Sequence, residues 1–132
     1  MESIVQEEEM IFQESLSSKM DTLILFEGYP EDWSGENVEI LGFSTGKPNE
    51  LNATKLSEYF SMEDKKAEEL LGFHGRDFYL AVENEGGEVI TDNGVEFNRG
   101  DKDWRSADKV YVVERKAAVL GQGDISMRLV VW

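Results

Sequence analysis

The sequence predicts an α+β fold in which a long N-terminal helix and a helical insertion pack on a mainly antiparallel β-sheet, as in pilin-like domains. Residues 3–25 have the apolar spacing of an amphipathic helix, and residues 53–71 show a second helical pattern. From residue 77 onward, apolar and polar side chains alternate as they do in strands. A helix stripe and the inner face of a sheet would together form one core.

Length and composition indicate a single folding unit. The chain has 132 residues, of which 40% are hydrophobic, and these values are ordinary for one globular domain. No internal repeat, low-complexity stretch or linker interrupts it. We therefore expect one domain over residues 1–132, made of an N-terminal helix over 1–27 and an α+β globular part over 28–132.

The first helix presents one apolar stripe, which the sheet of the same domain is expected to cover. Its members recur at spacings of three, four and seven: Ile4, Ile11, Phe12, Leu16, Met20, Leu23 and Ile24. The helical pattern begins directly after Met1. This start is expected of a sequence from which a preceding segment has been trimmed.

A loop from Gly28 to Asn37 follows the helix and carries an aromatic residue on each side of a proline. Pro30 restricts its own backbone and that of Tyr29, and Trp33 has a large apolar surface that gains by burial. We expect Tyr29 and Trp33 to clamp the base of the helix to the sheet. The alternative is an exposed aromatic pair that contacts a partner or a glycan.

Two helices separated by a break near Phe60-Ser61 are predicted after a strand over residues 38–43. Asn52 suits the N-cap of the first helix. Ser61 followed by Asp64 resembles a capping box that would start the second helix, and Gly72 suits the left-handed residue that ends it. Because Asn52-Ala53-Thr54 is also an N-glycosylation sequon, Asn52 is a candidate glycosylation site as well as a cap.

The rest of the chain is predicted to be strands joined by turns. In order, these are a strand over 77–83, a hairpin turn over 85–88 that returns through 89–90, a turn over 92–94, a polar loop over 98–108, a strand over 110–120 and a last strand over 124–132. The last strand alternates most cleanly. Its inward set is expected to face the helix stripe, and consists of Ile125, Met127, Leu129 and Val131.

Charge and composition exclude several classes of function. The net charge is −15, with −12 in residues 1–72 and −3 in residues 73–132. Nucleic-acid affinity depends on neutralised phosphates, so DNA and RNA are not expected as ligands, and an anionic membrane surface is disfavoured for the same reason. The chain has no cysteine, which excludes disulfides, thiolate metal sites and a cysteine nucleophile.

No catalytic, cofactor-binding or metal site is expected. His74 is the only histidine. A multi-histidine metal site therefore cannot form, and a hydrolase triad could use only His74 as its base. The runs 101–103 and 92–94 offer oxygens but lack the spacing of a calcium-binding EF-hand. Arg99-Gly100-Asp101 is a tripeptide known from adhesive ligands, and its occurrence in a polar turn is expected to be chance.

A series of motifs goes beyond generic patterning. In order, they are Gly28-Tyr29-Pro30-Glu31-Asp32-Trp33, Asn37-Val38-Glu39-Ile40-Leu41-Gly42-Phe43, Leu51-Asn52-Ala53-Thr54-Lys55-Leu56, Leu70-Leu71-Gly72, Asp77-Phe78-Tyr79-Leu80 and, at the end, Val130-Val131-Trp132. This order resembles the soluble region of archaeal pilin-like proteins. These are small surface proteins that carry a class III (type IV pilin-like) signal and one N-terminal membrane helix. The resemblance covers most of residues 20–80 and the C-terminus.

The resemblance implies a non-enzymatic, extracytoplasmic domain of a membrane-anchored surface protein with a structural or adhesive role. It implies partners among other surface or pilin-like subunits, no cofactor, and membrane contact only through an N-terminal anchor that is absent from this sequence. The alternative is an intracellular acidic protein-binding module or nucleic-acid mimic. A mimic would align its carboxylates along one exposed ridge, whereas a surface protein would scatter them over all exposed faces.

Overall fold

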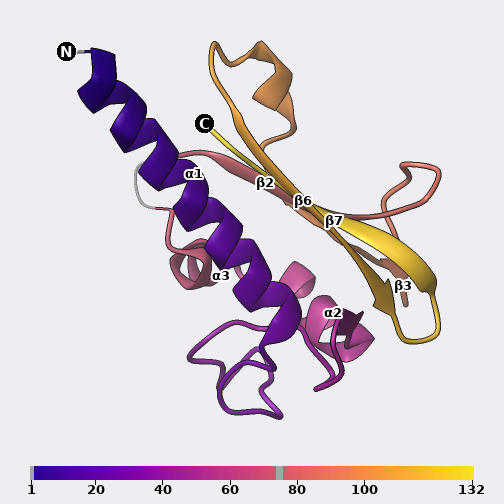
Figure 1. Ribbon diagram of the computed structural model, residues 1–132. Coiled ribbons are helices and arrows are strands. Elements are labelled where there is room, and N and C mark those ends of the chain that lie inside the picture. Colours follow the sequence, from indigo (N-terminus) through magenta and orange to yellow (C-terminus); the bar gives the residue numbers. More distant parts are fainter. Residues whose placement is uncertain (1, 74–75) are drawn as a thin grey trace.

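A long helix lies across one face of a curled, mainly antiparallel sheet, and two short helices complete the same layer (Figure 1). The computed structural model describes residues 2–73 and 76–132. Its helices are α1 (Glu2–Leu25), α2 (Ala53–Ser61), α3 (Asp64–Leu71) and the 3₁₀ helix η1 (Lys102–Ser106). Its strands are β1 (Glu50–Leu51), β2 (Phe78–Asn84), β3 (Thr91–Asp92), β4 (Val95–Glu96), β5 (Asn98–Gly100), β6 (Tyr111–Val119) and β7 (Gly123–Val131). The α+β class predicted from the sequence is confirmed.

The sheet has the order β1-β6-β7-β2-β5, and only the β1–β6 pair is parallel. β7 lies at its centre, where Leu129 is paired with Leu80 on one side and Val113 on the other. The four inward residues predicted for β7 are all buried. A separate two-stranded hairpin, β3–β4, turns at Asn93 and Gly94, both with positive φ, as the sequence signal there indicated.

The apolar stripe of α1 enters the core only from its middle onward. Leu16, Met20 and Leu23 are fully buried, and the ring of Phe12 meets that of Tyr111 edge-on at 4.7 Å between centroids. Ile11, predicted to belong to the stripe, is 65% exposed. The reason is angular: the next residue, Phe12, packs on Tyr111, and at about 100° per residue Ile11 points away from the sheet.

Arg115 ties α1 to the sheet. Its guanidinium donates to Asp21 at 3.0 Å and to the Ser17 hydroxyl at 3.1 Å, both on α1, and also to the backbone carbonyl of Glu114 at 3.0 Å. β1 covers only Ala118 and Val119 of β6. The arginine therefore bonds to the carbonyl oxygen of Glu114, on a part of β6 with which β1 does not pair.

The segment 38–43 does not form the predicted strand. It makes isolated bridges instead, between Tyr29 and Ile40 and, just beyond it, between Ser44 and Leu51. The backbone of Phe43 donates to the carbonyl of Leu23 at 2.8 Å and accepts from the amide of Asn52 at 2.7 Å. Because these hydrogen bonds go to the end of α1 and the start of α2, no continuous ladder can form.

The predicted break between two helices is present at residues 62–63, with the expected caps at its outer ends. The Asn52 side chain accepts from the amides of residues 54 and 55 at 2.9 and 3.2 Å, and Gly72 has φ +78°. The capping box predicted at Ser61 is wrong. Its hydroxyl bonds back to the carbonyl of Ser57 at 2.6 Å, and the N-cap of α3 is Glu63, without a side-chain cap.

The polar loop predicted over residues 98–108 contains β5 and η1. This segment returns over the outer face of the sheet, where Tyr79, Ala81 and Val130 form a second small core. Trp104 and Trp132 pack against it. The return over 89–90 is reduced to a single bridge between Glu83 and Val89. Over the described part of the chain, no helix is long and apolar enough to cross a membrane.

Gly42 is a position where a methyl group should be poorly tolerated for steric reasons alone, since its φ lies outside the left-handed region. A Cβ there would meet backbone atoms on two sides, the carbonyl oxygen of Phe26 and the amide nitrogen of Gly28. We expect Gly42→Ala to lower the free energy of unfolding by about 1–3 kcal/mol, measured by urea unfolding. Gly86→Ala is the matched control, since its Cβ would meet only the far ends of two side chains, Asn84 and Glu88. Equal stability of the two variants would contradict the packing at Gly42.

Candidate functional site

Trp33 and Tyr29, predicted to act as a pair, lie in different environments. Trp33 is 4% exposed, and its Nε1 donates to the carbonyl oxygen of Gly42 at 2.9 Å. Tyr29 is 56% exposed and does not pack, contrary to the clamp expected of it. Pro30, between them, is half-buried. The burial of one aromatic residue leaves the other available for contacts outside the domain.

Tyr29 is one of four exposed apolar residues near the end of α1. The others are Leu25, Phe26 and Ile40. Tyr29 and Ile40 exchange two backbone hydrogen bonds, at 2.9 and 3.2 Å, and directly opposite residues of this kind point to the same side. We call these four residues the basal strip. Glu27, Glu31, Asp32 and Glu39 accompany it in the sequence.

Lys55 holds the loop that carries the basal strip. Its Nζ is directed at two backbone carbonyls of that loop, Glu27 at 2.6 Å and Ser44 at 3.4 Å. Burial lowers the pKa of Lys55, and the charges of Glu27, Asp32 and Glu31 act in the opposite direction. Lys55 therefore has a structural role, because it donates to backbone carbonyls beyond the end of α1.

The side-chain oxygen of Asn52 caps the N-terminus of α2. The residue is half-buried. A glycan would be attached through Nδ2, and the cap uses only Oδ1. Glycosylation of Asn52 therefore stays a prediction with which the cap is compatible.

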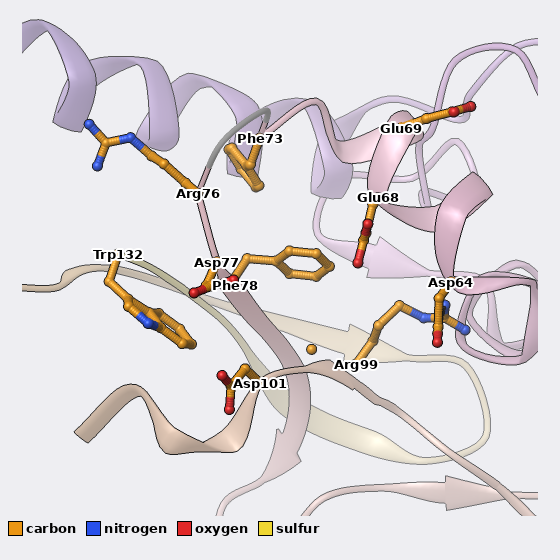
Figure 2. A pocket seen from close by; sticks show the side chains of 11 residues that line it. Asp64, Glu68, Glu69, Phe73, Arg76, Asp77, Phe78, Arg99, Asp101 and Trp132 are labelled. Atoms are coloured by element: carbon orange, nitrogen blue, oxygen red, sulfur yellow. Dashed lines mark hydrogen bonds and ion pairs between the residues drawn. The ribbon is translucent and has the colours of Figure 1, made fainter. Parts of the chain in front are cut away.

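A cavity of about 610 Å³ lies between α3, the segment leading into β2, and β5 with η1 (Figure 2). Three aromatic residues are in its lining: Phe73 and Phe78, which belong to the main core, and Trp132, which packs on the outer face of the sheet. Its carboxylates include Glu68 from α3 and Asp101 from the turn before η1. In Figure 2 the Glu68 carboxylate points toward the ring of Phe78. We call this space the Phe78 cavity.

Arg99 is the most constrained side chain of the cavity. It is 9% exposed, and its guanidinium donates to Asp64 at 3.0 Å and to the carbonyls of Phe60 and Met62 at 3.1 and 2.6 Å. Its Nε is buried without a partner among the described residues. Gly100 is paired with Tyr79 in the sheet. With its arginine buried, the Arg-Gly-Asp tripeptide is not presented as an adhesive ligand.

Arg76, the second cation of the cavity lining, turns away from it. Its guanidinium carbon lies 3.9 Å from the ring centroid of Phe12 and 5.7 Å from that of Tyr111. Figure 2 shows the guanidinium on the side nearest α1. This cation–π contact joins the segment before β2 to α1. Arg76 therefore stabilises the packing of the domain and is not directed at a ligand in the cavity.

Candidate metal and catalytic residues do not converge. Among the side chains that the structure describes, no three acidic or histidine residues are placed to hold a metal ion. Asp101 uses its Oδ1 to accept from the amide of Asp103 at 2.8 Å, which starts η1. Asp92 belongs to the β3–β4 hairpin. His74 lies outside the described residues.

Comparisons with known proteins add no relative. No family model, no curated protein and no solved structure matches the chain.

The Phe78 cavity could not be predicted from the sequence. It depends on the pairing of β2 with β5, which brings Arg99 next to Asp64, a residue 35 positions earlier. The only local signal was an arginine beside a glycine in a short polar stretch. That pattern is also typical of an ordinary surface turn.

Proposed function

We propose that this chain is the extracytoplasmic domain of a membrane-anchored, pilin-like surface protein with a structural or adhesive role. The course of α1 supports the proposal best. One face of its second half is buried in the core, whereas Met10 and Ile11 are exposed and the first turns extend beyond the strands (Figure 1). A helix that enters the domain from outside it suits a domain carried on an N-terminal membrane helix. The sequence motifs given above, which include the Trp33 loop and the Asn52 cap, support the same family.

The distribution of acidic residues favours this proposal over a nucleic-acid mimic. Exposed carboxylates lie on α1, in the loop after it, on α3, in the β2–β3 turn and around η1; examples are Glu14, Glu36, Glu69, Glu85 and Asp108. A mimic would need them aligned along one ridge at phosphate spacing. Scattered acids instead keep neighbouring copies apart and soluble at high density.

The basal strip supports an interaction role at the end of the domain opposite the N-terminus. Tyrosine is enriched at protein interfaces, and here it is exposed beside Ile40. We expect the pair of substitutions Tyr29→Ser and Ile40→Ser to leave the melting temperature within about 2 °C of wild type, because both side chains are already in water. The same variant is expected to be retained less at the cell surface. Thermal melts and surface yield measure the two effects.

The deciding experiment locates the native protein. Cells that produce it are sheared, and the sheared surface fraction, membranes and cytosol are probed with an antibody raised against residues 1–132. We expect the protein in the sheared or membrane fractions, and expect it to be cut when intact cells are treated with protease. A protein confined to the cytosol and protected from protease would refute the proposal and favour the acidic binding module.

A further inference from the structure

The segment that carries the basal strip is rich in acids and contains no base. It runs between Lys19 and Lys47, and its loop lies at the end of the molecule away from the N-terminus (Figure 1). Its acidic residues are Asp21, Glu27, Glu31, Asp32, Glu36 and Glu39. The last four are exposed, and none of them forms an ion pair with a residue that the structure describes.

Two lysines from elsewhere in the chain reach this segment, and the backbone engages both. Lys55 donates to two carbonyls of the loop, and Lys66 donates to the carbonyl of Gly35. Three carboxylates raise the pKa of the buried Lys55 against the lowering effect of its burial: Glu27, Asp32 and Glu31. One buried ammonium close to three carboxylates leaves a net negative potential toward the solvent.

Apolar side chains are exposed in the same segment. Tyr29 and Ile40 are 56% and 51% exposed, and their two mutual backbone hydrogen bonds place them on the same side of their bridge. Glu39 precedes Ile40, and Glu31 lies two positions after Tyr29. An apolar centre with charges of one sign at its rim is complementary to a partner that has apolar side chains and the opposite charge.

The same charges disfavour two other occupants of the basal strip. A second copy that met the first through the same strip would bring identical carboxylates together, in a chain whose net charge is −15. A membrane surface with anionic lipids would be repelled for the same reason. A cationic partner instead relieves the repulsion among the carboxylates.

We propose that the basal strip binds a cationic segment of another protein, in which apolar side chains lie between lysines or arginines. The apolar side chains pack on Tyr29 and Ile40, and the cations lie against Glu31, Asp32 and Glu39. Rim charges of this kind speed association and are screened by salt, whereas the packed centre slows dissociation. The inference rests on the interaction role proposed for the basal strip and names the chemistry of its partner.

The experiment titrates the isotope-labelled domain with three peptides of equal length and follows the amide shifts by NMR. Their repeating units are Lys-Leu-Lys-Ser, Glu-Leu-Glu-Ser and Lys-Ser-Lys-Ser. We expect the first peptide to bind and to shift the amides of Tyr29 and Ile40. The second should not bind, because its charges are repelled. The third should bind about tenfold more weakly than the first, because it has no apolar side chain to pack on the strip.

Two double variants separate the apolar centre from the charged rim. Tyr29→Ser with Ile40→Ser should weaken binding of the first peptide about tenfold, because the packed centre is lost. Glu31→Gln with Asp32→Asn should weaken it about fivefold at low salt, and should have less effect in about 500 mM sodium chloride, which screens exposed charges. All four side chains are exposed, so both variants should fold, and a melt verifies this.

Each double variant has a control of the same chemistry elsewhere on the domain. Leu120→Ser removes an exposed apolar side chain from the β6–β7 turn. Glu85→Gln with Glu88→Gln removes two exposed acids from the β2–β3 turn and so makes the same change in net charge as the rim variant. Both controls should bind the first peptide like wild type. Equal weakening by the Glu85 and Glu88 substitutions would show attraction to the whole acidic domain and would contradict a specific site.

Absence of binding of the first peptide up to about 1 mM would overturn the proposal, as would binding that both strip variants leave unchanged. Self-association in sedimentation, or binding to phosphatidylcholine vesicles, would assign the strip to another occupant if Tyr29→Ser with Ile40→Ser abolished it. Peptide binding is measured on the purified domain and surface retention on cells. A variant that loses the peptide but is retained at the surface would refute the retention role and leave the partner chemistry intact.

Discussion

Leu129→Asp is expected to abolish cooperative folding of the domain. Leu129 is fully buried at the centre of the sheet, between Leu80 and Val113. Losing the leucine side chain costs about 2–5 kcal/mol, and an uncompensated buried charge adds about 3–5 kcal/mol. Their sum is comparable to the whole stability of a typical domain, about 5–15 kcal/mol. Circular dichroism during a thermal melt measures the outcome.

The control for this substitution is Leu120→Asp. Leu120 lies in the β6–β7 turn and is exposed, so a carboxylate there stays in water and the melt should be close to wild type. A cooperative transition of Leu129→Asp within a degree or two of wild type would show that β7 is not central to the core.

Trp33→Ala is expected to have the next largest effect, about 3–5 kcal/mol of lost stability. For a chain of this length that corresponds to a fall of about 10–20 °C in melting temperature. The indole fills the space between the end of α1 and Phe43, and its Nε1 satisfies the carbonyl of Gly42. Trp33→Phe keeps most of the ring but loses that hydrogen bond, and should cost about 1–2 kcal/mol.

Fluorescence checks the same environment without removing Trp33. In a variant with Trp104→Phe and Trp132→Phe, the remaining emission should be blue-shifted and poorly quenched by acrylamide. Free quenching of Trp33 in a folded protein would contradict its burial. It would place Trp33 with Tyr29 among the residues available to a partner.

The parts of the fold that could be predicted are those in which one local rule decides the outcome. In β7 every inward position is apolar and the outward positions include Ser126 and Arg128, so period-two alternation sets both the strand and its buried face. The cap at Asn52 and the stop at Gly72 follow from capping chemistry in the same way. The break between α2 and α3 is present, although the capping box at Ser61 that predicted it does not form. Trp33 was found because a large aromatic side chain next to a restricted loop gains by burial.

The errors arose where partners distant in the sequence compete with local preference. Residues 38–43 have strand-like side chains, but the backbone of Phe43 bonds to α1 and to the start of α2 instead of to a strand. Ile11 has stripe-like spacing in the sequence, yet it points away from the sheet while its neighbour Phe12 packs on Tyr111. β5 has only three residues and a polar sequence, so its pairing with β2 and the resulting cavity follow from tertiary contacts alone.

The contacts of Arg115 have a consequence for copies of the domain crowded on a surface. Beyond β1, the edge of β6 offers backbone groups to which a strand of a neighbouring molecule could add. The arginine occupies the Glu114 carbonyl on that edge and is itself held by Asp21 and Ser17 of α1. A neighbour could extend the sheet there only by breaking these bonds. At this edge, a contact between neighbouring molecules would thus be made by side chains and not by an added strand.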